Sequence, residues 1–158
     1  MPGIRLARPD EADTLTALCV RSKAMWGYDA AFMARTRAAL TVTAAEIASG
    51  GVWVAEDGDG IVGMAAIEAP DQTGRALLDK LFIEPERTGH GVGQALMTAI
   101  CNVAKASGAT VVRLLADPNA APFYERWGAK RVGEESSATF PGRMLPAFEI
   151  DLLDRDRT

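Results

Sequence analysis

The segment from Pro85 to Leu96 carries the clearest chemical signal in the sequence. Three glycines, Gly89, Gly91 and Gly93, alternate with other residues and lead directly into a segment with helical apolar spacing. The first turn of a helix has N–H groups without intrahelical partners, and the helix dipole adds partial positive charge there. Glycine also lets the main chain approach a ligand closely. The segment therefore predicts a loop that binds phosphate or pyrophosphate, with a merely glycine-rich turn as the alternative.

Two common phosphate-binding motifs do not fit this loop. A Walker loop ends in Gly-Lys-Ser/Thr, whereas this loop ends in Gly93-Gln94-Ala95. A dinucleotide fingerprint needs a further glycine three residues after its second one, and those positions hold Gln94 or Leu96. Binding of ATP or NAD by this loop is therefore disfavoured.

A second block follows at residues 117–129, where Asn119 precedes the pair Tyr124-Glu125 and then Gly128. The interval between the two blocks has room for one helix and one strand. Together, in this order, they resemble the GNAT superfamily of N-acetyltransferases, with its Gln/Arg-x-x-Gly-x-Gly/Ala loop and its Asn…Tyr-Glu-x-x-Gly-Phe segment. This chain departs from the pattern at Thr88, where the family has Gln or Arg, and at Ala129, where it has an aromatic residue.

The resemblance implies an α+β fold with a GNAT-like mixed, mostly antiparallel central sheet of about six to seven strands flanked by helices. It implies an acetyl-CoA-dependent N-acetyltransferase that uses no metal and passes the acetyl group to a primary amine of a small molecule or peptide. The amine would attack the thioester directly. The other hypothesis is a non-catalytic acyl-CoA-binding sensor or partner module. The retained Tyr124 argues against the sensor.

By resemblance, the loop holds the CoA pyrophosphate while pantetheine pairs with the preceding strand edge, where a main-chain N–H polarises the thioester carbonyl. Tyr124 is the expected general acid for the leaving thiolate. Asn119 would bond pantetheine or cap its helix. Asp79 and Glu84 are the candidate bases, and His90 is read as a loop residue beside the phosphates. The expected cofactor-binding residues are Leu81, Phe82, Ile83, Arg87, Thr88, Gly89, His90, Gly91, Val92, Gly93, Gln94, Asn119, Phe123 and Tyr124.

The acceptor pocket in this family is built by two connections, here residues 23–28 and 136–144. Trp26, Tyr28 and Phe140 are candidates for an apolar wall, and Arg143 is a candidate clamp for a carboxylate. The alternative is ordinary packing and an exposed arginine. The sequence does not name the acceptor.

The elements that must position these residues follow from periodicity and turn chemistry. We expect a parallel neighbour for the strand–helix–strand unit around 78–115. The expected strands are 3–8, 52–56, 61–69, 75–84, 110–115, 129–134 and 147–153. The first expected helix has Asp10 as its cap and fades near Trp26. A second follows Asp29, and a further helical turn is expected at 43–49. The last two run from just after Gly93 to 107 and from 117 to 128.

Length and composition fit a single N-acetyltransferase domain over residues 1–158, with 48% hydrophobic and 24% charged residues. The net charge of −4, without a basic stripe, disfavours nucleic acid as a partner. No signal peptide or bilayer-spanning run is evident, so a cytoplasmic protein with no membrane partner is expected. Cys19 and Cys101 are expected to be reduced and buried. A homodimer stays open, because similar proteins commonly dimerise.

Overall fold

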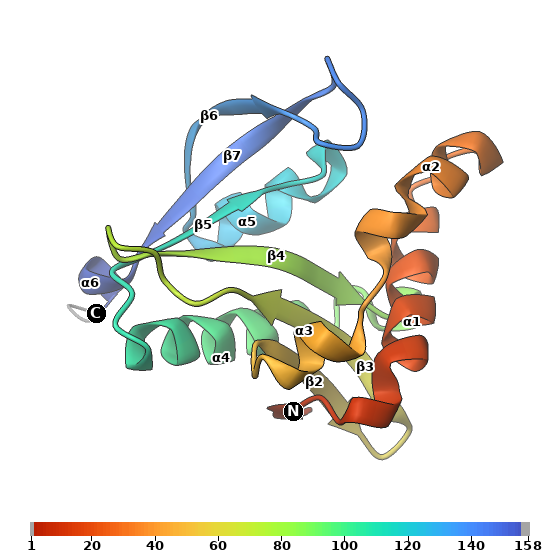
Figure 1. Ribbon diagram of the computed structural model, residues 1–158, viewed down its shortest axis with the longest axis horizontal. Helices are drawn as coiled ribbons and strands as arrows, with labels where there is room; N and C mark the ends of the chain where they lie inside the picture. Colours follow the sequence, from red (N-terminus) through yellow and green to blue (C-terminus); the bar gives the residue numbers. More distant parts are fainter. Residues whose placement is uncertain (1, 156–158) are drawn as a thin grey trace. The chain divides into compact units, whose positions relative to one another are not determined.

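The computed structural model describes residues 2–155. Its strands are β1 Gly3–Leu6, β2 Val52–Asp57, β3 Gly60–Ile67, β4 Arg75–Ile83, β5 Val111–Leu115, β6 Lys130–Ser136 and β7 Met144–Asp151. Its α-helices are α1 Ala12–Ala24, α2 Ala30–Leu40, α3 Ala44–Ala48, α4 Val92–Ala106, α5 Ala121–Trp127 and α6 Leu152–Arg155. Three short 3₁₀ turns are η1 Pro9–Glu11, η2 Pro85–Arg87 and η3 Pro118–Ala120. Figure 1 shows their course along the chain.

The chain divides into two compact units, which are described separately. Unit 1 contains residues 2–66 and 80–100, and unit 2 contains residues 67–79 and 101–155. The boundaries fall inside β3, β4 and α4, so these three elements contribute to both units. The expectation of one domain over residues 1–158 stays a prediction.

The strands form one seven-stranded sheet in the order β1-β2-β3-β4-β5-β7-β6. The β1–β2, β2–β3, β5–β7 and β6–β7 pairs are antiparallel, whereas β4 and β5 are parallel. A mixed, mostly antiparallel sheet flanked by helices confirms the predicted fold class. The parallel β4–β5 pair encloses α4, as expected for a crossover connection that must return the chain to the same end of the sheet.

Local capping chemistry sets the starts of α2 and α3 in unit 1. The Asp29 carboxylate accepts a hydrogen bond from the Phe32 N–H at 2.8 Å and starts α2, as predicted. Thr43 and Glu46 form a capping box that starts α3. The prediction that Asp10 caps the first helix is wrong. Pro9 opens a 3₁₀ turn instead, because its fixed φ suits a first helical position, and α1 begins at Ala12.

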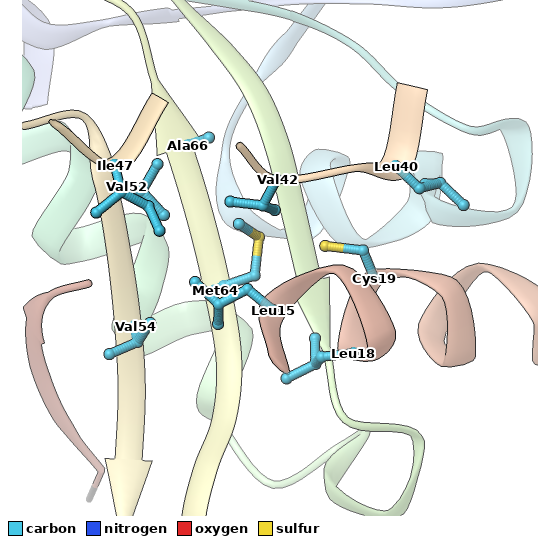
Figure 2. Close-up of a cluster of buried hydrophobic side chains, with 10 residues drawn as sticks. All are labelled: Leu15, Leu18, Cys19, Leu40, Val42, Ile47, Val52, Val54, Met64 and Ala66. Carbon is cyan, nitrogen blue, oxygen red and sulfur yellow. The ribbon is translucent and has the colours of Figure 1, made fainter. Parts of the chain in front are cut away.

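The core of unit 1 lies between β2, β3 and the three helices α1, α2 and α3. Figure 2 shows Leu15 and Leu18 of α1 directed toward Met64 of β3. On the opposite side of β3, Gly63 faces α4. A Cβ added at Gly63 would lie 2.9 Å from Val92 Cγ1 and 3.0 Å from Leu96 Cδ1. The missing side chain therefore lets the first turn of α4 pack directly on the strand.

In unit 2, α5 packs on β7 through Tyr124 and Phe148. Four predicted strands end one or two residues earlier than expected, namely β1, β3, β4 and β7. The first strand stops at Leu6 because the Arg8–Glu11 segment turns, and the last gives way to α6 at Leu152. The Asp151 carboxylate accepts a hydrogen bond from the Leu153 N–H at 2.9 Å, which favours the turn of helix over further strand.

Both cysteines are buried thiols outside any disulfide, as predicted. In the part of the chain that the structure describes, no helix has both the length and the apolar character needed to cross a membrane.

Candidate functional site

The loop between β4 and α4 is a chain of tight turns that ends in a helix. The Arg87 N–H donates to the Glu84 carbonyl at 2.8 Å, and the His90 N–H donates to the Arg87 carbonyl at 3.1 Å. Gly91 follows with a φ of 84° and offers its carbonyl to the Ala95 N–H at 3.0 Å. Only glycine adopts that φ without strain, which explains why this residue type precedes the helix.

The same hydrogen bonds show which main-chain donors of the loop are still available. Within residues 2–155, the N–H groups of Arg87, Thr88, His90 and Ala95 have carbonyl partners. No such partner is present among the described residues for the N–H groups of Gly89 and of the run Gly91–Gln94. A Cβ added at Gly89 or Gly91 would meet no atom within 4 Å, so the loop is open above these glycines. Five unpaired donors at the start of a 15-residue helix form a suitable cradle for an anion.

Contacts from α1, from the residue that follows it and from the β2–β3 hairpin, all in unit 1, support this loop. Arg21 of α1 binds Glu84 through both carboxylate oxygens at 2.8 Å. The Thr88 hydroxyl lies 3.8 Å from the Met25 sulfur, just after α1. Arg87 forms ion pairs with Asp57 and Asp59 at the tip of the β2–β3 hairpin. The pKa of Arg87 is raised because its guanidinium donates hydrogen bonds to Asp57. Sequence reasoning missed these carboxylate partners, although it predicted the two flanking strands, 52–56 and 61–69.

The strand before the loop, β4, is paired with β5 over only part of its length. The β4–β5 ladder consists of three residue pairs and ends at Leu77↔Arg113, although β4 continues to Ile83. On its other side, the strand stays joined to β3, since the Glu84 N–H donates to the Val62 carbonyl at 2.9 Å. The predicted segment Leu81–Ile83 therefore lies on a strand edge beyond the end of the ladder with β5. An extended ligand can add to such an edge through main-chain hydrogen bonds.

Tyr124 is buried in unit 2, on the helix that starts at Ala121. Its ring meets Phe123 edge-on at 5.1 Å between centroids and lies tilted against Phe148 at 5.9 Å. Burial raises the pKa of its hydroxyl well above the ordinary value, because the phenolate would lose hydration. Among the described residues, only Trp53 Nε1 is a fully buried side-chain polar atom without a partner, so the Tyr124 oxygen is not sealed off unsatisfied.

Asp117 organises the turn that precedes α5. Its Oδ1 accepts hydrogen bonds from the Asn119 N–H at 2.8 Å and from Asn119 Nδ2 at 3.0 Å. The helix-capping group of this turn is therefore Asp117 rather than Asn119, and the side-chain amide of Asn119 has a fixed orientation. The Asp117 Oδ2 also lies 3.9 Å from Arg143. Arg143, the predicted carboxylate clamp, thus already faces an internal carboxylate.

The two predicted acceptor segments belong to different units. In unit 1, the Tyr28 and Phe32 rings stack at 3.9 Å, and the Lys23 ammonium lies 5.4 Å from the Tyr28 ring centroid. Trp26 is 40% exposed. In unit 2, the buried Ser137 hydroxyl accepts hydrogen bonds from the N–H groups of Thr139 and Phe140 and shapes the β6–β7 loop. Tyr28 therefore has an aromatic partner, as a packing role would also require.

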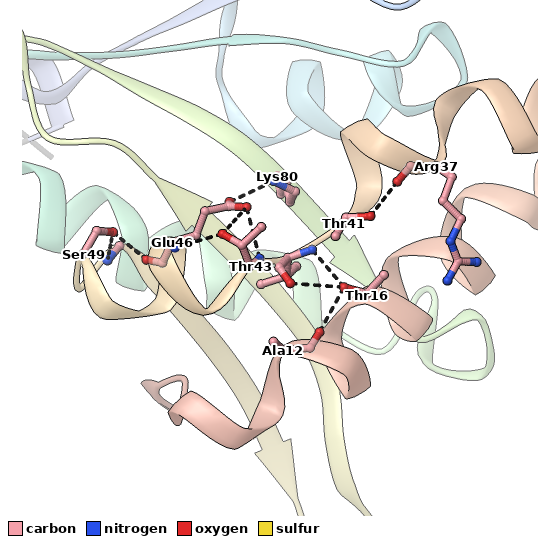
Figure 3. A network of polar contacts seen from close by, with 10 residues as sticks. Ala12, Thr16, Arg37, Thr41, Thr43, Glu46, Ser49 and Lys80 are labelled. Atoms are coloured by element: carbon pink, nitrogen blue, oxygen red, sulfur yellow. Dashed lines mark hydrogen bonds and ion pairs between the residues drawn. The ribbon is translucent and has the colours of Figure 1, made fainter.

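The candidate bases differ in their surroundings. Both Glu84 oxygens are engaged by Arg21, whereas Asp79 is an exposed residue of β4 in unit 2. His90 is exposed on the loop. Near the same strand, sequence reasoning missed a buried ion pair between Lys80 and Glu46 at 3.0 Å (Figure 3). The available signal was the alternation of β4, which places Lys80 on the same buried side as Ala76 and Leu78.

The predicted site residues thus fall into two groups. Unit 1 brings together the β4 edge and the loop from Leu81 to Gln94, with Glu84, Arg87 and His90. Unit 2 brings together Asn119, Phe123 and Tyr124, and it also contains Asp79. No group of three or more metal-ligating side chains occurs within the described range 2–155.

Comparison with protein families gives a match to an acetyltransferase (GNAT) domain over residues 48–128, just over half of the chain. The matched region contains both the glycine loop and Tyr124. No curated protein matches the sequence.

Many solved structures share the fold. PaiA N-acetyltransferase from Thermoplasma acidophilum, in complex with coenzyme A, has a TM-score of 0.75 at 16% identity, covering 96% of this chain and 99% of that one. The acetyltransferase yncA from Salmonella typhimurium, with acetyl-CoA, has a TM-score of 0.69 at 16% identity, covering 96% and 94%. An aminoglycoside 6′-N-acetyltransferase complexed with coenzyme A has a TM-score of 0.70 at 17% identity, covering 95% and 97%. At these identities the likeness establishes the fold.

Proposed function

Because the chain belongs to the GNAT family of acetyltransferases, we propose that it transfers an acetyl group from acetyl-CoA to a primary amine of a small molecule or peptide. The observation that carries the proposal is the set of five unpaired main-chain N–H groups at Gly89 and Gly91–Gln94, directly ahead of α4. Main-chain donors at a helix start suit the pyrophosphate of CoA. Structural neighbours crystallised with CoA or acetyl-CoA support the same co-substrate.

The β4 edge fits the pantetheine arm. Beyond the end of the β4–β5 ladder, Leu81–Ile83 can pair with the amides of an extended chain as an added strand would. We propose that one N–H of this segment donates to the thioester carbonyl and so stabilises the negative charge that develops on its oxygen. We propose Asn119, whose side chain is held by Asp117, as a further polar contact of the pantetheine arm.

The chemistry requires two proton movements. The neutral amine attacks the carbonyl carbon, the C–S bond breaks, and the departing thiolate takes a proton from the Tyr124 hydroxyl. The raised pKa keeps the phenol protonated at neutral pH but also makes it a weaker acid than an ordinary tyrosine, so the proposed role requires direct donation to the sulfur as the C–S bond breaks. The attacking nitrogen loses one proton to a base. We propose that Asp79 or Glu84, the two carboxylates on or just after β4, takes this proton; Glu84 would have to give up at least one of its bonds to Arg21 to do so.

Replacing Tyr124 with Phe tests the acid role while keeping the buried ring. We expect kcat to fall by roughly 10²- to 10⁴-fold, the usual contribution of a general acid, with the Kd for CoA unchanged. The measurement is free-thiol release from acetyl-CoA with a panel of amines, next to calorimetric titration of CoA. An unchanged kcat would remove Tyr124 from the mechanism.

The same experiment separates the enzyme from the alternative function. A non-catalytic acyl-CoA sensor would bind CoA tightly and release no thiol with any amine. Cleavage of the thioester that depends on the added amine would contradict the sensor. The aminoglycoside 6′-N-acetyltransferase among the structural neighbours makes cationic amines a sensible first set of acceptors to test.

A further inference from the structure

Arg87 occupies a central position in the glycine loop. Its N–H closes the first turn onto the Glu84 carbonyl, and its own carbonyl accepts the His90 N–H that closes the next turn. Movement of Arg87 would therefore displace both turns and the donors at Gly89 and Gly91 that follow them. Its side chain is one quarter exposed and points to the β2–β3 hairpin.

The hairpin holds this side chain with two carboxylates. Arg87 Nη1 donates to Asp57 and Nη2 donates to Asp59. The other Asp57 oxygen accepts the Asp59 N–H at 2.8 Å, so Asp57 fixes the hairpin turn and the arginine at once. This N–H and Arg87 together keep the pKa of Asp57 below its ordinary value, so the carboxylate stays charged at neutral pH.

We infer that Arg87 is a positioning residue, which ties the glycine loop to the β2–β3 hairpin through Asp57 and Asp59 and thereby sets the geometry of the CoA-binding amides. The inference rests on the proposed function and concerns the same site. A direct phosphate contact by Arg87 would require the guanidinium to give up two carboxylates within its own unit. The structure instead shows the Arg87 side chain bound to Asp57 and Asp59, so that it links the glycine loop to the hairpin turn. We call this three-residue link the strut.

The strut and simple electrostatics predict opposite changes in CoA affinity when the hairpin carboxylates are removed. Removing two negative charges beside an anion-binding loop should tighten CoA binding if electrostatics alone mattered. The strut predicts the opposite, because Asp57→Asn/Asp59→Asn releases Arg87 and loosens the loop. Asparagine suits turns and can still accept the Asp59 N–H at position 57, so the hairpin itself should persist.

The test compares wild type with Arg87→Gln, with Asp57→Asn/Asp59→Asn and with the triple variant. We expect the first two to weaken CoA binding by a similar factor, roughly 10-fold, and the triple variant to be no weaker than either. In turnover, KM for acetyl-CoA should rise while kcat stays near wild type. Arg87→Lys should recover part of the affinity. As a control, Arg131→Gln removes an exposed ion pair with Glu134 in unit 2 and should not change the Kd for CoA.

Two outcomes would overturn the inference. Tighter or unchanged CoA binding in Asp57→Asn/Asp59→Asn would show that the carboxylates do not support the loop. A triple variant weakened beyond both parents would show independent roles. Amide hydrogen exchange without CoA provides a second readout, in which Gly89–Val92 should exchange faster in both the Arg87 and the hairpin variants. One further result separates the two proposals: wild type binds no CoA, while the Arg87 and hairpin variants still exchange Gly89–Val92 amides faster than wild type. That result would contradict the proposed function but would leave the strut supported.

Discussion

At the level of single residues, burial sets the ionisation of Tyr124. The surrounding rings of Phe123 and Phe148 remove its phenol from water, and the cost of exposing a phenolate to that environment raises its pKa. Burial therefore keeps the phenol neutral but does not strengthen it as an acid, so the proposed role depends on direct contact between its hydroxyl and the thiolate sulfur. The same burial also makes an ionisation experiment possible, because it separates this tyrosine from an ordinary one.

We expect phenolate titration of wild type and of Tyr124→Phe to coincide until well above pH ~10, the ordinary tyrosine value. In the unfolded chain Tyr124 ionises near that value, whereas in the folded protein it ionises at higher pH. The stability linked to the neutral phenol is therefore complete below pH ~10 and is lost as pH rises toward the folded pKa. Thermal unfolding above pH ~10 should show wild type losing stability faster than Tyr124→Phe. A phenolate from Tyr124 at its ordinary pH would contradict this account.

Residue types predicted which kind of ligand the loop would bind, but they did not predict which side chains contact one another around it. The glycines at 89 and 91 indicated an anion loop, and the structure places open space above both. Arg87 was expected to bind near a phosphate because it lies in that loop. The sequence could not reveal its partners Asp57 and Asp59, because that contact depends on how the hairpin lies against the loop in space.

At the scale of elements, the buried pair of Lys80 and Glu46 joins α3 to β4 (Figure 3). The Lys80 side chain is only 6% exposed, so its charge depends on the carboxylate beside it. Glu46 has a second task, since its other oxygen accepts the Thr43 N–H at 3.3 Å in the capping box of α3. One carboxylate therefore caps a helix and neutralises a buried lysine of the neighbouring strand.

Glu46→Gln separates these two tasks, because glutamine can still cap the helix. We expect a loss of roughly 2–3 kcal/mol in the free energy of unfolding, somewhat below the cost of breaking a fully buried pair, since Glu46 is about one third exposed. Lys80→Met should change stability by less than about 1 kcal/mol, and combining it with Glu46→Gln should restore most of the loss. Denaturant unfolding measures all three.

Glu125→Gln, at an exposed position of α5, is the matched control for this series. If Glu46→Gln costs no more than the control, Lys80 does not depend on Glu46 for its charge.

Elements were predicted well where local chemistry decides them. Asp29, the Thr43–Glu46 box and the hairpin turn after Asp57 all carry their signals in neighbouring residues. The errors in the predicted elements lie at their ends, where other local hydrogen bonds compete with continuation of the strand or helix. The last strand gives way to α6 because the Asp151 side chain caps the turn, a choice that apolar alternation does not reveal.

For the whole molecule, two motifs in the right order predicted the family and the sheet class. The seven-stranded order with one parallel pair agrees with that expectation. The early end of the β4–β5 ladder at Leu77 had no counterpart in the sequence, since both strands remain apolar and extended in pattern. The acceptor pocket expected from residues 23–28 and 136–144 stays a prediction, because residue types alone do not define the shape of a pocket.

The central claim is that unpaired main-chain donors around Gly91 hold CoA. Gly91→Ala tests it most directly, with Gly50→Ala as a matched control. Both glycines have nearly the same φ, 84° and 83°, and a Cβ at either meets no atom within 4 Å, so both variants carry similar backbone strain of about 1 kcal/mol. Calorimetric titration should show CoA affinity reduced at least ~10-fold in Gly91→Ala and unchanged in Gly50→Ala. Equal affinity in both variants and in wild type would contradict the account.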